Sequence, residues 1–193
     1  MKKQGFTLAE VLITLVIIGI IAAMTLPSLL GGTNKQEIKT GLQKSISVLT
    51  QAITLQYALT GDDFSTLSNS SVANVETFAK ARLNLKAVNG SNYTTQDGII
   101  YDLSGITKPC NSTSPCNITV DVNGGKAPNT LTEDSAAKLS DIKDQFTLYV
   151  YGTTVTAAKS VCTDSEGGNL SGTNCTFYDN SAAVKFLDDK IAN

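Results

Sequence analysis

The chain has 193 residues, with 15 basic and 17 acidic side chains, a formal net charge of −2, four cysteines and no histidine. A chain of this length predicts one globular domain. Its nearly balanced, slightly acidic charge gives no electrostatic footprint for nucleic acid. The lack of histidine largely excludes zinc sites and histidine-based acid–base catalysis.

The N-terminal region consists of a short basic leader, residues 1–5, and an almost unbroken apolar run, residues 6–30. A helix over that run would be about 38 Å long, which exceeds the ~30 Å hydrocarbon core of a bilayer. A secretory signal peptide has a shorter apolar run and a clear cleavage site, which this sequence lacks. The run therefore predicts a membrane-spanning helix, and Lys2 and Lys3 predict a cytoplasmic N-terminus.

One acidic residue, Glu10, lies inside this apolar run. A carboxylate is costly to place in a membrane, so an acid in a spanning helix predicts a functional site with a specific partner. The segment that ends at this acid, Gly5-Phe6-Thr7-Leu8-Ala9-Glu10, resembles the processing site of type IV pilins and type II secretion pseudopilins. The resemblance is close over residues 2–30, and beyond them only the layout is similar.

This resemblance assigns roles to single residues. It implies that a prepilin peptidase cuts between Gly5 and Phe6 and methylates Phe6, so that Glu10 becomes the fifth residue of the mature chain. A proline near position 22 of the mature chain is common in the family, and Pro27 matches it. Because proline removes a backbone donor, we expect a helix kink at Pro27.

The cleavage would also create a partner for Glu10. It frees the α-amino group of Phe6, which is mostly cationic at neutral pH because its ordinary pKa is near ~8. Glu10 could pair with the amine of another subunit during assembly, or with its own amine, since residues four apart share a helix face. The inter-subunit pair is the favoured interpretation, and the family resemblance supports much of it.

Residues 31–60 predict an amphipathic continuation of the helix. Gly31 and Gly32 should weaken the helix at its start, and Gly61 should end it. Between them, residues recur at helical spacing and form the stripe predicted to face the core: Ile38, Leu42, Ser45, Ile46, Leu49, Ile53, Gln56 and Tyr57.

Residues 61–193 predict a globular domain of short helices and strands. We expect strands with β-branched residues between turns over 99–103, 118–122, 146–151 and 154–159, short helices over 72–85 and 182–191, and a polar turn-rich stretch over 89–97. Long helices followed by strands indicate an α+β fold. The resemblance makes this a pilin-like fold, in which a long N-terminal helix packs on a small antiparallel sheet.

The four cysteines predict disulfides, because the domain would be exported. They allow three connectivities, and the sequence does not choose among them. We favour the local pairs Cys110–Cys116 and Cys162–Cys175, since each brackets a polar loop that would gain most from a covalent bond. The loop between Cys162 and Cys175 could be an exposed recognition loop, like the C-terminal disulfide loop of many type IV pilins, or a structural staple only.

No catalytic or metal constellation is evident in the sequence. The segment from Asp121 to Gly124 is similar to the start of a calcium loop, but the twelfth position from Asp121 is Thr132, with Glu133 one residue later. We therefore expect a polar turn there, with no metal, no cofactor and no enzymatic activity.

The function predicted is that of a structural subunit of a type IV pilus or pilus-like filament. The precursor would sit in the bacterial inner membrane, meet the prepilin peptidase and the pilus assembly machinery, and polymerise with itself or with homologous subunits into a cell-surface or periplasmic filament. No nucleic-acid site is expected. Two alternatives are a type II secretion pseudopilin and a membrane-tethered periplasmic binding module.

Overall fold

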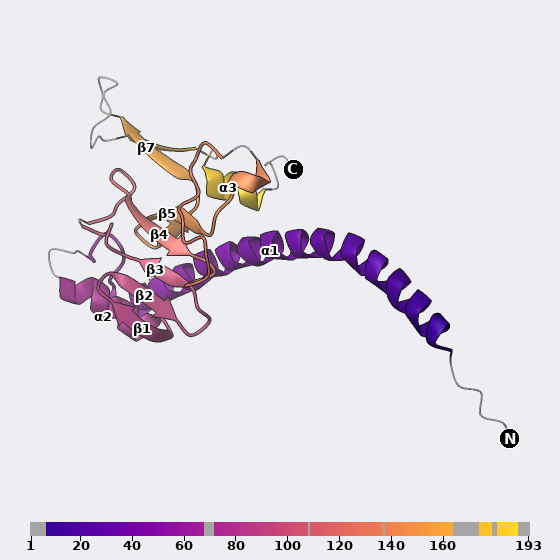
Figure 1. Cartoon of the computed structure of the whole chain (residues 1–193). Coiled ribbons are helices and arrows are strands. Elements are labelled where there is room, and N and C mark those ends of the chain that lie inside the picture. The colour runs from indigo at the N-terminus through magenta and orange to yellow at the C-terminus, as the bar shows by residue number, and fades with distance from the viewer. Residues whose placement is uncertain are drawn as a thin grey trace. The chain divides into compact units, whose positions relative to one another are not determined.

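The computed structural model describes residues 7–67, 72–107, 109–136, 138–163, 174–178 and 181–188. It has an α+β fold, as predicted, with a long N-terminal helix and a small antiparallel sheet (Figure 1). In chain order the elements are α1 (Leu8–Thr60), α2 (Val72–Arg82), β1 (Leu85–Asn89), β2 (Asn92–Thr95), β3 (Ile100–Asp102), β4 (Cys116–Asp121), the 3-10 turn η2 (Leu139–Asp141), β5 (Gln145–Tyr151), β6 (Thr154–Thr156), β7 (Lys159–Thr163), β8 (Asn174–Tyr178) and α3 (Ala182–Leu187).

The chain divides into two units, residues 1–37 and 38–193, and α1 contributes to both. The helical backbone continues through Pro27 and the Gly31-Gly32 pair, so these residues do not end the helix. The kink at Pro27 stays a prediction. The helix ends as predicted at Gly61, whose N–H donates to the Tyr57 carbonyl at 2.9 Å and whose φ of +79° suits glycine.

The main sheet of the second unit has six antiparallel strands in the order β1-β2-β3-β4-β5-β6, so each strand pairs with its neighbours in sequence. Strand β5 confirms the predicted alternation, since Phe146, Leu148 and Val150 are buried while the residues between them are half-buried. Gly152, with a φ of +51°, lies in the tight turn that joins β5 to β6, as predicted.

The polar stretch over residues 89–97 has the predicted turns, at 90–91 and 96–97, but the strand β2 between them was missed. Strands β1 and β2 form a hairpin there, with Asn89 paired to Asn92 across a two-residue turn that Gly90 enters at a φ of +60°. The two central residues are Gly90 and Ser91, and a glycine with positive φ at the first central position is typical of a type II′ hairpin turn. Within β2, Tyr93 and Thr95 alternate inward, which gives this polar strand its buried face.

The core of the second unit lies between α1 and one face of the sheet. The fully buried side chains of Leu42, Leu49 and Ile53 on α1 belong to the same hydrophobic cluster as Tyr101 and Leu148 of the sheet. This confirms most of the predicted helix stripe. Tyr57 is the exception, with 54% of its surface exposed.

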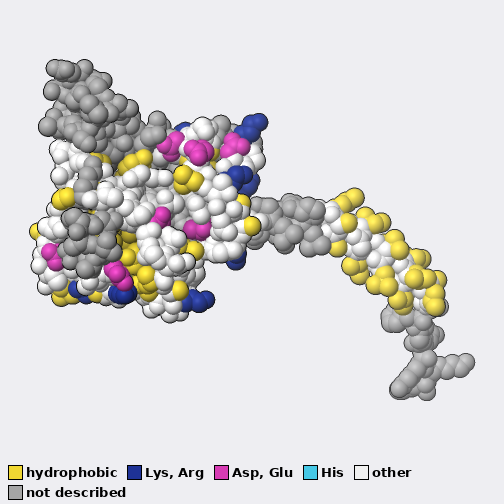
Figure 2. All heavy atoms as spheres, turned by 60° about the vertical axis from the view of Figure 1, so that its left-hand side comes forward, with side chains coloured by type: hydrophobic (Ala, Val, Ile, Leu, Met, Phe, Trp, Pro, Cys, Tyr) yellow, Lys and Arg dark blue, Asp and Glu magenta, His cyan; other side chains and the backbone are white. Residues whose placement is uncertain are grey.

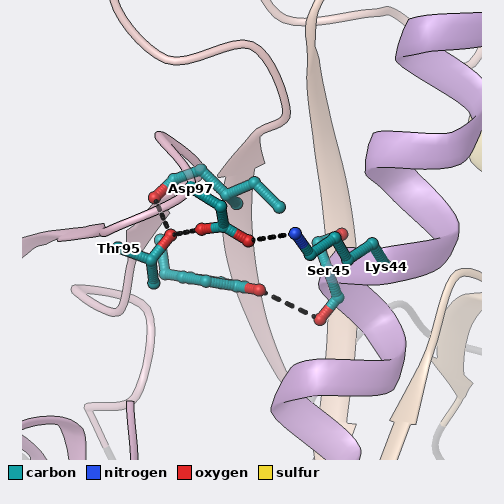
Figure 3. A network of polar contacts seen from close by, with 6 residues as sticks. Lys44, Ser45, Thr95 and Asp97 are labelled. Carbon is teal, nitrogen blue, oxygen red and sulfur yellow. Dashed lines mark hydrogen bonds and ion pairs between the residues drawn. The ribbon is translucent and has the colours of Figure 1, made fainter. Parts of the chain in front are cut away.

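A polar network also joins α1 to the sheet (Figure 3). Lys44 Nζ lies 2.6 Å from Asp97 Oδ2, and the Thr95 hydroxyl donates to the same carboxylate. Nearby, the Tyr101 hydroxyl donates to the backbone carbonyl of Ser45 at 3.2 Å. Burial raises the pKa of Tyr101 far above its ordinary value, so this phenol stays neutral and remains a donor.

The disulfide Cys110–Cys116 is present, with its Cα atoms 5.3 Å apart. The backbone of Cys110 receives a hydrogen bond from the Gly152 N–H at 3.0 Å and donates one to the Phe64 carbonyl at 2.8 Å. The bridge closes a loop of six residues, and the backbone of Cys110 links this loop to the segment after α1 and to the β5–β6 turn.

Strands β7 and β8 form a separate two-stranded sheet in which Cys162 pairs with Cys175 in the backbone register. Directly opposed residues of antiparallel strands have Cα atoms roughly 4.5–5.5 Å apart, which a disulfide can bridge. The second predicted disulfide is compatible with this register and stays a prediction. Most of the recognition loop proposed between these cysteines lies outside the described residues.

The C-terminal helix α3 is shorter than the predicted 182–191 and packs on strand β5. Ser181 caps it, because the Val184 N–H donates to the Ser181 hydroxyl oxygen at 3.1 Å. The rings of Phe186 on α3 and Phe146 on β5 stack with their centres 5.9 Å apart. Asp188 closes the helix, and residues 189–193 lie outside the described part.

Candidate functional site: the N-terminal helix

The first part of α1 presents an apolar surface that the fold does not cover. The segment Leu8–Thr25 is long and apolar enough to cross a membrane, and none of it is buried within the protein. Figure 2 shows apolar side chains over the visible face of this segment. A helix with apolar residues all round has its place in lipid or among other helices. This surface is therefore a candidate membrane and assembly site.

The start of the helix explains how Glu10 is held in the single chain. Thr7 is the residue just before the helix, and its N–H donates to Glu10 Oε2 at 2.7 Å while its hydroxyl donates to the same oxygen at 2.8 Å. In return, the Glu10 N–H donates to the Thr7 hydroxyl oxygen at 3.3 Å. This reciprocal arrangement is a capping box, which satisfies N–H groups that a helix start leaves unpaired.

Thr7 was not predicted as a partner of Glu10. The pairing of Glu10 with an amine, from a neighbouring subunit or from its own chain, stays a prediction. The spacing Thr7-x-x-Glu10 before an apolar run is the sequence signal of a capping box and could have identified it. Gly5 and Phe6 lie outside the described residues, and the side chain of Pro27 is likewise outside them.

The described part of the globular unit shows few features of an active site. Across the described residues, no three His, Cys, Asp or Glu side chains cluster as a metal site. One groove, lined by Asp102 and Asp121 among others, lies on the outer face of the sheet. Of the four cysteines, Cys110 and Cys116 form a disulfide and therefore have no free thiol.

The architecture is that of an α+β protein with a long N-terminal helix, whose first part is apolar and exposed. Comparison with known protein families gives the particular motif: residues 1–26 match the family model of the prokaryotic N-terminal methylation motif, the signature of type IV pilins and pseudopilins. No curated protein and no solved structure matches the chain.

The motif supports a type IV pilin-like or pseudopilin precursor. It implies processing by prepilin peptidase and assembly into filaments, and it points to a structural subunit and not an enzyme. Together with the apolar helix, it fits a membrane-anchored precursor.

Proposed function

We propose that the protein is a subunit of a type IV pilus or pilus-like filament, inserted in the bacterial inner membrane before assembly and polymerised through α1. The observation that carries the proposal is the fully uncovered apolar helix surface Leu8–Thr25 in a chain that bears the methylation motif. Lipid covers this surface in the precursor, and the helices of other subunits cover it in the filament.

Glu10 has a specific role in this transfer. In the single chain, Thr7 donates two hydrogen bonds to one oxygen of the carboxylate, Oε2. A carboxylate has about four acceptor positions, so Glu10 retains capacity for a further, charged donor. We assign that donor to the methylated amine of Phe6 in a neighbouring subunit, which neutralises both charges as the helices pack and sets the register between subunits.

The contacts between subunits would repeat without closing a ring. A heterologous interface whose rotation does not close generates an open helical fibre. In this scheme the kink at Pro27 lets the embedded part of α1 adjust its direction to the neighbouring helices. The disulfides Cys110–Cys116 and Cys162–Cys175 would stabilise the exported domain against unfolding.

Two experiments test the proposal. Mass spectrometry of the mature chain should find methylated Phe6 as the N-terminal residue, and any other N-terminus contradicts the processing. In the second experiment, Glu10→Val should leave the subunit inserted in the membrane but strongly reduce filament yield. Thr14→Val is the matched control, because its hydroxyl only bonds to the Val11 carbonyl of its own helix. Normal filaments from the Glu10 variant would refute the role of this residue.

The two alternatives make different predictions. Deleting a type II secretion pseudopilin would stop protein secretion, whereas deleting a pilin would remove surface fibres. A membrane-tethered binding module would keep an uncleaved or conventionally cleaved N-terminus and remain monomeric in detergent. The exposed apolar helix in a chain that carries the methylation motif favours the filament over a simple anchor.

A further inference from the structure

The chain contains the triplet Val-Asn-Gly twice, at residues 88–90 and at residues 122–124, and the fold gives the two copies different surroundings. The first copy lies where β1 turns into β2, and the second lies in the loop after β4. Asparagine is chemically labile, most of all before glycine, because glycine has no Cβ to shield its backbone nitrogen. Since the local sequences are the same, the structure decides which asparagine reacts.

The reaction open to such a triplet is deamidation, which needs only the chain and water. The glycine backbone nitrogen forms a bond to the side-chain amide carbon of asparagine and closes a succinimide ring. The bond from that carbon to the amide nitrogen breaks, and the amide leaves as ammonia with the proton that the glycine nitrogen gives up. One water molecule then opens the ring. Opening at one carbonyl gives aspartate, and opening at the other gives isoaspartate, in which the main chain runs through the side-chain carboxyl carbon.

Both reacting groups of the first triplet are open to solvent. Asn89 and Gly90 are exposed, and a Cβ built on Gly90 would meet no atom within 4 Å. Within the described part of the chain, neither the Asn89 side-chain amide nor the Gly90 N–H makes a hydrogen bond. The Asn89 side chain therefore has room to approach the Gly90 nitrogen, and no existing contact has to break first.

The hairpin that carries this triplet is held more firmly at its far end than at its turn. Strand β1 is at the edge of the sheet and pairs only with β2. At the far end, the Gln96 N–H donates to the Asn84 carbonyl at 2.9 Å and Gln96 Nε2 donates to the Leu85 carbonyl at 3.1 Å. At the turn, the last pair of the ladder is Asn89 with Asn92. Exposed turns at a sheet edge open locally at low cost, which gives Asn89 the backbone rotation that ring closure requires.

The second triplet is held rigidly. The Asp121 carboxylate accepts the Asn123 N–H at 3.2 Å and also accepts the Gly124 N–H, so the nitrogen that would attack is already engaged. Gly124 packs so closely on the Gly98 carbonyl that a Cβ would lie 2.3 Å from its oxygen. The Asn123 side-chain oxygen is buried. Ring closure at Asn123 therefore requires this packed loop to open first.

We propose that Asn89 is a self-modification site of the folded protein, at which Gly90 converts the asparagine to aspartate and isoaspartate while Asn123 is protected. Isoaspartate adds one main-chain carbon and a negative charge to a turn that closes over two residues. The pair of Asn89 with Asn92 is then lost, and the end of β1 separates from β2. Because β1 is an edge strand, the modification loosens this edge and leaves the core in place. It accumulates with time, so it changes this edge most in the molecules that persist longest.

The test incubates the full-length chain in detergent micelles at mildly alkaline pH and follows both asparagines by mass spectrometry of proteolytic peptides, with fragmentation to place each new acid. Asn89 should convert at least about tenfold faster than Asn123, which corresponds to an extra opening free energy of about 1.4 kcal/mol at the second triplet. In urea that unfolds the domain, the two rates should become nearly equal, because the local sequences are the same. The proposal is overturned if Asn89 stays intact in the folded protein or converts no faster than Asn123.

Two variants separate the added charge from the added main-chain carbon. Asn89→Asp introduces the charge alone, and Asn89→Gln keeps a neutral amide whose longer side chain closes a ring far more slowly. Hydrogen exchange of the β1 and β2 amides should be faster in the aged protein than in freshly prepared Asn89→Asp. Aged Asn89→Gln should exchange like the fresh unchanged protein, and the Tm should differ little among all of them because the edge lies outside the core. Unchanged exchange in the aged protein, or equally fast exchange in aged Asn89→Gln, would refute the effect assigned to isoaspartate.

Discussion

The packing of α1 on the sheet can be tested with Leu49→Ala. Leu49 is fully buried in the cluster between the helix and the sheet, so the substitution removes three carbons and leaves a cavity. Such changes cost about 2–5 kcal/mol, with the larger values where the surroundings cannot relax. Because Leu49 is enclosed by a helix on one side and paired strands on the other, we expect a loss of about 3–4 kcal/mol in the free energy of unfolding.

The assay is urea or thermal unfolding of the full-length chain in detergent micelles, followed by the circular dichroism of the sheet and helix. Leu55→Ala is the matched control, because it makes the same change on the same helix at a residue that is 49% exposed. It should change the free energy of unfolding by less than about 1 kcal/mol, since surface substitutions away from special features have small effects. Equal losses in the two variants would refute the core derived from the structure.

Three more predictions concern close packing and pH. Gly105→Ala places a Cβ only 1.7 Å from the carbonyl oxygen of Asn117, so the backbone must move. Chemical denaturation should show a loss of about 1–3 kcal/mol in the free energy of unfolding. Gly125→Ala, with open space around the new Cβ, should show almost no loss. Burial raises the pKa of Asp97, but hydrogen bonds from Lys44 on α1 and from a threonine hydroxyl lower it more, so its net pKa is below the ordinary value. The stability that Asp97 contributes is therefore present above pH ~4 and lost as the pH falls further. Asp97→Asn should make the acid side of a profile of Tm against pH shallower. At neutral pH it should lower the free energy of unfolding by at most about 1 kcal/mol. Burial raises the pKa of Tyr101, so the folded state keeps its proton longer than the unfolded state, and Tm should fall as the pH rises above ~10; Tyr101→Phe should weaken that alkaline fall.

The features predicted correctly depend on local pattern. The apolar run, the alternation of Phe146, Leu148 and Val150 in β5, and the helix stop at Gly61 each follow from residue type and spacing within a few positions. These predictions hold because each depends only on neighbouring residues. Alternation along a strand determines which face is buried, and the backbone freedom of glycine allows a helix to end.

The features that were missed have a different physical origin. The hairpin of β1 and β2 contains mostly polar residues, and Tyr93 is buried because it joins the hydrophobic cluster that also holds Leu49 of α1 and Phe78 of α2. The buried Asp144 accepts hydrogen bonds from the backbone N–H groups of Asn129 and Thr130 only because the loop between β4 and β5 folds back. Such contacts leave no repeating pattern in the sequence. The length of the loop, and not the repeat of a helix or strand, sets the spacing between the residues that meet.

The side chains of the exposed helix surface Leu8–Thr25 are not buried in the protein, so they contribute little to the stability of the folded domain. In the filament proposed above, substitutions on this surface would alter membrane insertion and subunit contacts without weakening that domain. Changes to the sheet and its loops would alter the outer surface of the proposed filament and leave the helix contacts unchanged. The two surfaces could therefore vary independently in sequence.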